Sequence, residues 1–229
     1  MLQEIAITDQ LHWLKHGPFA SGQGHWLPNR FDAYLKLLLP VGIDHSIPLK
    51  EFSPKRSTIA EMNARAAFWR KYDIGGPSAT ADKLTPIKYS ELAKIWNVPY
   101  DKDFTTEKII KACGEWPPNL RESTKLNEQF IQLLTQMLGP STPTYFSDTI
   151  ENGDYHWVDD LPADWLELGT AADLLQVYQR DKQFPGDVFD TKLTWCLSHM
   201  EFTDYLILGC PARVAHDISR HPEIESFHL

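Results

Sequence analysis

The residues whose types could do chemistry gather most densely in residues 194–210, TWCLSHMEFTDYLILGC. Cys196, His199 and Cys210 carry sulfur and imidazole groups, which can ligate metals or act as nucleophiles. Side chains alternate along a strand, so Cys196 and His199 would point to opposite faces. We therefore interpret this segment as an antiparallel hairpin that turns near Thr203, with Cys196 acting as a small core residue.

Cys210 has a second interpretation, because it directly precedes a predicted helix. The positive N-terminal end of that helix could lower the pKa of the thiol. A reactive thiol also needs a neighbouring base, and His216 lies about a turn and a half further along the same helix. The structural interpretation of Cys210 is therefore preferred.

Two other patterns resemble metal sites, and both lack a required ligand. His12 and His16 have the four-residue spacing of helical zinc ligands, but Trp13 stands where the metalloprotease motif has Glu. Asp148 opens a calcium-like loop that has Ile150 at the third position, where an oxygen ligand belongs. We expect no metal site and no cofactor.

Sequence motifs of the common enzyme classes are absent. The chain contains no GxSxG nucleophile elbow, no P-loop and no GxGxxG motif. No catalytic residue is therefore predicted. The alternative is a hydrolase-like enzyme in which the fold joins His156 or His199 to two carboxylates in a cleft. A third possibility, a structural domain without a specific ligand, also stays open.

Charge is distributed very unevenly along the chain. The net charge of the 229 residues is −9, but residues 145–229 hold 16 Asp and Glu against 5 Lys and Arg, a net of −11. The preceding residues carry a net of +2, and no Lys or Arg occurs from Leu126 to Gln179. Such a field disfavours nucleic acid, whose phosphates need basic side chains, and favours a basic protein partner. The same acids could instead serve only to keep the protein in solution.

The acidic stretch supplies a candidate binding surface with two aromatic anchors. Carboxylates would steer a basic partner to the surface, and the tryptophans would supply most of the affinity. The candidate residues are Asp148, Glu151, Asp154, Trp157, Asp159, Asp160, Asp164 and Trp165.

Hydrophobic periodicity and turn residues predict an α+β fold with a helix-rich first part and an antiparallel sheet formed largely by the C-terminal part. In the helix at 57–73, Ser57 or Thr58 can cap the start, and Glu61 closes a capping box on Thr58. Ile59, Met62, Ala66 and Trp69 or Arg70 follow helical spacing. Further helices are predicted at 88–96, 105–114, 121–139, 170–181 and 211–221. Strands are predicted at 30–40, 144–150, 154–160, 164–169, 191–202, 205–209 and 224–229, with a loop at 74–86. We interpret Asn152-Gly153 as the tight turn of a hairpin formed by 144–150 and 154–160. We expect one domain, 1–229, with possible lobes at 1–140 and 141–229.

The cysteines and the hydropathy of the chain indicate the cellular compartment of the protein. The three cysteines form no CxxC pair, and the N-terminus lacks a basic start followed by an apolar stretch. No apolar run approaches the roughly 18 residues that cross a bilayer. We expect a reduced, cytoplasmic protein that does not contact membranes.

The C-terminal run from Leu193 resembles the closing segment of a loose group of uncharacterised bacterial proteins. The matching residues are Trp195, Cys196, Asp204, Gly209, Pro222 and Glu225, and YSELAKIW resembles an earlier helix of the group. His199 and Met200 stand where the group usually has acids, and Cys210 replaces a glycine. The resemblance implies a small bacterial accessory protein, some of which are immunity proteins that neutralise a toxin. We therefore expect a non-enzymatic binding protein, plausibly an immunity-type inhibitor.

Overall fold

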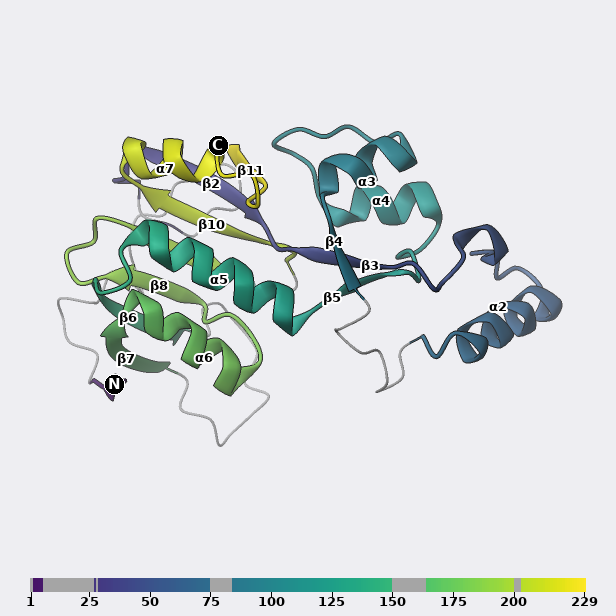
Figure 1. Ribbon diagram of the computed structural model, residues 1–229, viewed down its shortest axis with the longest axis horizontal. Helices are drawn as coiled ribbons and strands as arrows, with labels where there is room; N and C mark the ends of the chain where they lie inside the picture. The colour runs from purple at the N-terminus through teal and green to yellow at the C-terminus, as the bar shows by residue number, and fades with distance from the viewer. Residues whose placement is uncertain (1, 6–26, 28, 75–83, 150–163, 200–202) are drawn as a thin grey trace. The chain divides into compact units, whose positions relative to one another are not determined.

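Two antiparallel sheets organise the chain, which confirms the predicted α+β class (Figure 1). The computed structural model describes residues 2–5, 27, 29–74, 84–149, 164–199 and 203–229. The chain forms two compact units: unit 1 comprises Met1–Leu38 and Phe130–Leu229, and unit 2 comprises Leu39–Gln129. The possible lobes 1–140 and 141–229 would have one boundary in the sequence. The two units have two boundaries, because unit 2 is inserted between Leu38 and Phe130 of unit 1.

Unit 1 is built on an eight-stranded sheet with the order β1-β7-β6-β8-β9-β10-β2-β11. Each pair of neighbouring strands in this sheet is antiparallel. Its strands are β1 (Gln3–Glu4), β2 (Ala33–Leu38), β6 (Pro143–Thr149), β7 (Asp164–Thr170), β8 (Asp187–Asp190), β9 (Cys196–His199), β10 (Tyr205–Cys210) and β11 (Ser226–His228).

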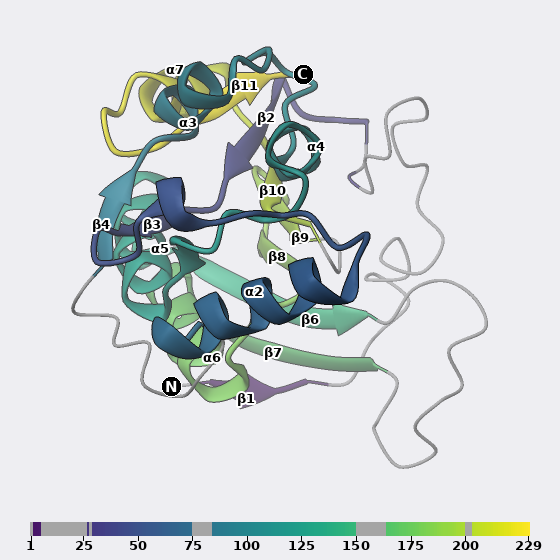
Figure 2. The same cartoon turned by 90° about the vertical axis from the view of Figure 1, so that its right-hand side faces the viewer.

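One face of this sheet packs on helices (Figure 2). The helices of unit 1 are α6 (Leu174–Asp181), α7 (Ala212–Ser219) and the C-terminal part of α5 (Thr124–Leu138). The ion pair between Glu167 of β7 and Arg180 of α6 identifies the helix side of β7. Leu35 and Leu208 are register partners in β2 and β10, and both are fully buried. In the part of α5 that belongs to unit 1, Phe130, Leu134 and Leu138 are also buried.

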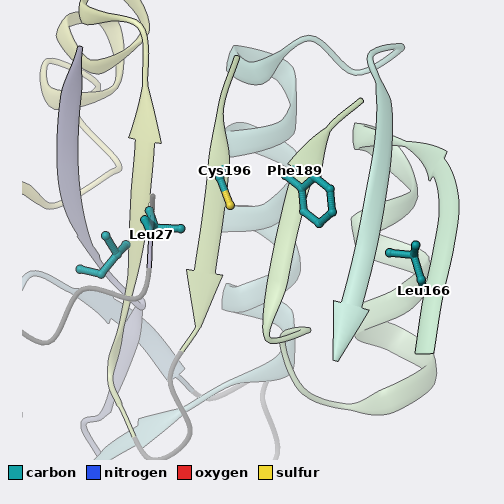
Figure 3. Packing of buried hydrophobic residues seen from close by; sticks show 5 residues of the cluster. Leu27, Leu166, Phe189 and Cys196 are labelled. Carbon is teal, nitrogen blue, oxygen red and sulfur yellow. The ribbon is translucent and has the colours of Figure 1, made fainter. Parts of the chain in front are cut away.

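The opposite face of the sheet carries a second apolar cluster (Figure 3). Leu27 packs there with Leu166, Phe189, Cys196 and Ile207, all at most 3% exposed. Phe189 and Cys196 are direct cross-strand partners, so their side chains share this face. Both faces of the central part of the sheet are therefore buried, and β10, with the sequence YLILGC, is accordingly an apolar run rather than an alternating pattern.

The predicted hairpin of residues 194–210 is confirmed. β9 pairs with β10 through Leu206–His199 and Gly209–Cys196. Gly209 is required because a Cβ there would come within 2.3 Å of the Phe31 ring. Cys196 is a buried residue of the apolar cluster, as expected.

Unit 2 contains a three-stranded sheet and short helices around a separate core. β3 (Val41–Asp44) lies between β4 (Leu84–Ile87) and β5 (Leu120–Glu122). The helices are the 3₁₀ turn η2 (Leu49–Glu51), α2 (Ile59–Lys71), α3 (Tyr89–Trp96) and α4 (Thr106–Cys113). The fully buried Phe104 ring lies 5.5 Å from Tyr89 and 5.3 Å from Tyr100 between ring centroids. This aromatic group joins the entry of α3 to the turn before α4.

Three features of the structure differ from the sequence prediction. β6 pairs along its whole length with β7 and, on its other edge, with β8, rather than with the predicted strand 154–160, which lies outside the described residues. The predicted loop 74–86 ends in the strand β4. The short strands β3, β5 and β8 were not predicted, because three or four residues give too little periodicity.

Candidate protein-binding surfaces

Helix α2 begins with a complete capping box, as predicted. The Thr58 hydroxyl accepts a hydrogen bond from the Glu61 amide at 3.2 Å, and the Glu61 carboxylate accepts from the Thr58 amide at 3.0 Å. The same carboxylate also accepts from the Ser57 amide at 2.9 Å. These bonds satisfy amides that a helix start otherwise leaves without partners.

One side of α2 is anchored within unit 2 by a buried carboxylate. Glu115, just after α4, receives hydrogen bonds from Arg56 and from Arg65, whose Nη2 lies 2.9 Å from Glu115 Oε2. Arg65 also stacks on the Trp69 ring, with 4.5 Å between its Cζ and the ring centroid. Two arginines around one nearly buried acid make charge-assisted bonds, which are stronger than neutral ones.

Phe68 is the one residue of α2 that is buried. Its ring lies 5.4 Å from Phe52 and 4.8 Å from Tyr72 between centroids. The contacts of α2 therefore concentrate on the side that carries Phe68 and Arg65.

The opposite side of α2 is exposed although it is partly apolar. Ile59 is 78% exposed and Met62 is 53% exposed, and Ala66 and Arg70 are exposed further along the helix. These four residues, spaced i, i+3, i+7 and i+11, form one helical stripe that we call the α2 face. Complete burial of an Ile or Met side chain contributes about 1.5–3 kcal/mol of stabilisation. Covering the exposed Ile59 and Met62 side chains with a partner would therefore stabilise a complex.

The surroundings of the α2 face are basic. Residues 50–71 contain six Lys and Arg against two Glu, a net of +4, and the net is still +3 when Glu115 is included. Glu61 is engaged in the capping box, and Glu51 accepts from Lys71 Nζ at 3.0 Å and from the Tyr72 hydroxyl at 2.8 Å. Both acids of this segment thus have partners within unit 2.

The predicted acidic surface falls in unit 1, mostly in residues that the structure does not describe. Asp148 lies in β6, and Asp164 and Trp165 lie in β7; the backbone register pairs Asp148 with Trp165 and Thr149 with Asp164. Three of the candidate residues are thus brought to the same end of two adjacent strands. The other five lie outside the described residues: Glu151, Asp154, Trp157, Asp159 and Asp160.

The unit boundaries coincide with the division of charge. Unit 1 contains 19 Asp and Glu against 8 Lys and Arg, a net of −11, and unit 2 contains 12 against 14, a net of +2. Part of the acidity is paired locally, because Arg180 binds Asp181 at 2.7 Å and Glu167 at 2.8 Å. These two carboxylates raise the pKa of Arg180 above its ordinary value.

Cys196 and Cys210 have the environment of core residues, whereas Cys113 is partly exposed. Burial raises the pKa of Cys210 to about 12, which overturns the interpretation in which the helix dipole lowers it. Burial also raises the pKa of Cys196, with smaller contributions from Asp187 and Asp190. A protonated, buried thiol is a poor nucleophile and a poor metal ligand.

The histidines do not form a cluster in the described part of the chain. The His199 ring packs 5.7 Å from the Phe184 ring between centroids, and its Nε2 lies 3.5 Å from the Thr203 carbonyl. His12, His16 and His156 lie outside the described residues. Among the described residues, no three His, Cys, Asp or Glu side chains are grouped as metal ligands would be. In the same residues, no helix has the length and apolar character needed to cross a membrane.

Sequence reasoning found the acidic stretch and missed the α2 face. The signal for the α2 face was available, because Ile59, Met62 and Ala66 have helical spacing and basic residues flank them. Such spacing is normally typical of a buried helix face. Only the position of Phe68 and Glu115 on the other side shows that this face is exposed.

Comparison with known proteins gives one distant likeness. The chain is 22% identical over 174 residues to the protein named arrestin-related trafficking adapter 10 from Saccharomyces cerevisiae, in strains YJM789 and RM11-1a among others. The aligned region is 76% of this chain and 33% of the adapter, so the chain spans about a third of the length of the curated relatives it matches. No family model matches the chain, and no solved structure matches it.

Proposed function

We propose that this chain is a non-enzymatic binding protein whose acidic unit 1 docks a basic protein. The observation that carries the proposal is the segregation of charge, with a net of −11 in unit 1 and +2 in unit 2. A field of one sign on one unit attracts partners of the opposite charge and orients them before contact.

An immunity-type inhibitor that neutralises a basic toxin is the form of this role that the C-terminal sequence resemblance implies. The distant likeness to a protein named a trafficking adapter supports the broader class, because an adapter acts by binding. The three free cysteines fit a reduced compartment, and we propose the cytoplasm as its location.

The test is affinity capture from the native host at low ionic strength, followed by elution at about 0.5 M NaCl, which screens exposed charges. A basic protein that elutes with salt is then purified, and its affinity is measured for the wild type and for Asp159→Lys/Asp160→Lys/Asp164→Lys. We expect the triple variant to bind at least about tenfold more weakly, mainly through slower association.

The matched control is Glu91→Lys/Glu107→Lys/Glu122→Lys, which reverses three exposed acids of unit 2 and changes the net charge equally. Binding that falls equally in both triple variants would show a response to total charge rather than to unit 1. Unchanged affinity in the first variant refutes the proposal. Loss of the captured protein's own activity on binding would identify the immunity-type role.

A further inference from the structure

We propose that the α2 face is a second binding surface, which takes an acidic amphipathic helix of a partner protein. The α2 face lies in unit 2, and the segment around it is positively charged, whereas unit 1 is negatively charged. The proposal is therefore independent of the docking proposed for unit 1. The inference rests on three observations: the exposed apolar residues of α2, the anchor on its other side, and the basic residues around it.

The apolar residues have the geometry of helix packing. Ile59, Met62 and Ala66 follow one another at intervals of three and four residues, which forms a ridge along one side of a helix. Ala66 at the third position lets a second helix approach closely, while Ile59 and Met62 supply the apolar area. A helix of a partner with apolar side chains at matching intervals would cover this ridge.

The anchor presents the ridge in one orientation. Thr58 and Glu61 fix the start of the helix, and Arg56 and Arg65 hold it through Glu115 on the side away from Ile59. Because the ridge is already helical before binding, less conformational entropy is lost on association than for a segment that folds on binding.

Charge decides which helix fits. Arg70 lies one turn beyond Ala66 on the same face and is exposed, and Lys55 is exposed shortly before the helix. Arg56 and Arg65 are paired with Glu115 on the other side of α2, and Lys71 is paired with Glu51, so Arg70 and Lys55 are the exposed basic residues on which the charge preference of the α2 face rests. A helix with acidic residues beside its apolar stripe is complementary, and a basic one is repelled.

The experiment is a selection on the full-length chain with a display library of helical peptides of about five turns, in which the residues beside a fixed apolar stripe are randomised. We expect the wild type to enrich acidic peptides. Affinities of purified peptides are then measured for Ile59→Ser/Met62→Ser and for Arg70→Glu. Both variants should weaken binding at least about tenfold. The control, Ile95→Ser, removes a residue that is 61% exposed on α3 and should leave the affinities unchanged.

Several outcomes would overturn the proposal. Enrichment of neutral or basic peptides would refute the stated partner chemistry, and a library with no enrichment would refute helix binding. Equal affinity for wild type and Ile59→Ser/Met62→Ser would place the peptide elsewhere. Sedimentation velocity adds a further test, because a dimer that this double variant abolishes would make a second copy of the chain the occupant. Circular dichroism of each variant ensures that the helix is intact.

Discussion

At the scale of single residues, Glu115 is the one charged residue that is buried among the described residues of unit 2. Its carboxylate is nearly buried and accepts hydrogen bonds from Arg56 and Arg65, which lie 59 and 50 residues away in sequence. Removing the negative charge of this carboxylate should destabilise the fold, because the guanidinium groups of both arginines then lose their ionic partner.

Glu115→Gln should therefore lower the free energy of unfolding by about 1–3 kcal/mol, less than for a fully buried pair because Arg56 is half exposed. Urea denaturation followed by tryptophan fluorescence measures the change. The control is Glu122→Gln, whose exposed side chain should change stability by less than about 0.5 kcal/mol. Equal losses in the two variants would contradict the role of Glu115.

Cys210 gives a pH dependence with a definite sign. Burial raises the pKa of its thiol to about 12, whereas a thiol in an unfolded chain titrates near 8.5. The folded state thus holds the proton more tightly, so this stabilising contribution is complete below the unfolded pKa and is lost as the pH rises toward the folded pKa. Through Cys210, the free energy of unfolding should fall by about 1–2 kcal/mol from about pH 8 to about pH 10.

The measurement compares the wild type with Cys210→Ala at several pH values. The variant loses stability at every pH because it lacks the buried sulfur, but it should lack this part of the slope. Parallel pH curves for the two proteins would show that Cys210 does not titrate as its burial implies.

At the scale of elements, α2 buries one of its 13 residues, Phe68, so the hydrogen bonds of its capping box matter for its stability. Thr58→Ala should destabilise the start of α2 by about 1 kcal/mol and speed hydrogen exchange of its amides about fivefold. Thr105→Ala is the matched control, because Thr105 precedes α4 without a side-chain capping bond. A similar effect at both helices would argue against the capping box as the cause.

The elements also show what the sequence can and cannot predict. The capping box of α2, the end of α4 at Gly114 and the end of α5 at Gly139 follow from local chemistry, and both glycines have positive φ. The strand β3 was missed because Pro40 ends one strand and the next begins at Val41. The partner of β6 was predicted from an Asn-Gly turn, whereas long-range packing selects β7. The exposure of the α2 face depends on contacts between distant residues, which periodicity does not encode.

At the scale of the whole molecule, the two units differ strongly in net charge. Repulsion among like charges destabilises a folded state, and salt screens it. Unit 1, with a net of −11, should gain about 0.5–1 kcal/mol from about 0.02 M to about 0.5 M NaCl, and unit 2, with +2, should gain less.

Hydrogen exchange measures both units in one sample, through the amides of β10 and of β3. Exchange should slow about two- to fivefold in β10 and change little in β3. Sucrose in place of salt is the control, because it stabilises proteins without screening charge. An equal response of both units to NaCl would contradict a charge division between them.

The insertion of unit 2 into unit 1 has a consequence for synthesis on the ribosome. β2 ends at Leu38, and its two neighbours in the sheet, β10 and β11, begin at Tyr205 and Ser226. At about 5–20 residues per second, β2 waits on the order of 10–30 s for its first partner. The sheet of unit 2 has all its strands once Glu122 emerges, whereas both edges of β2, with its buried leucines, are still without their partners and open to wrong pairing.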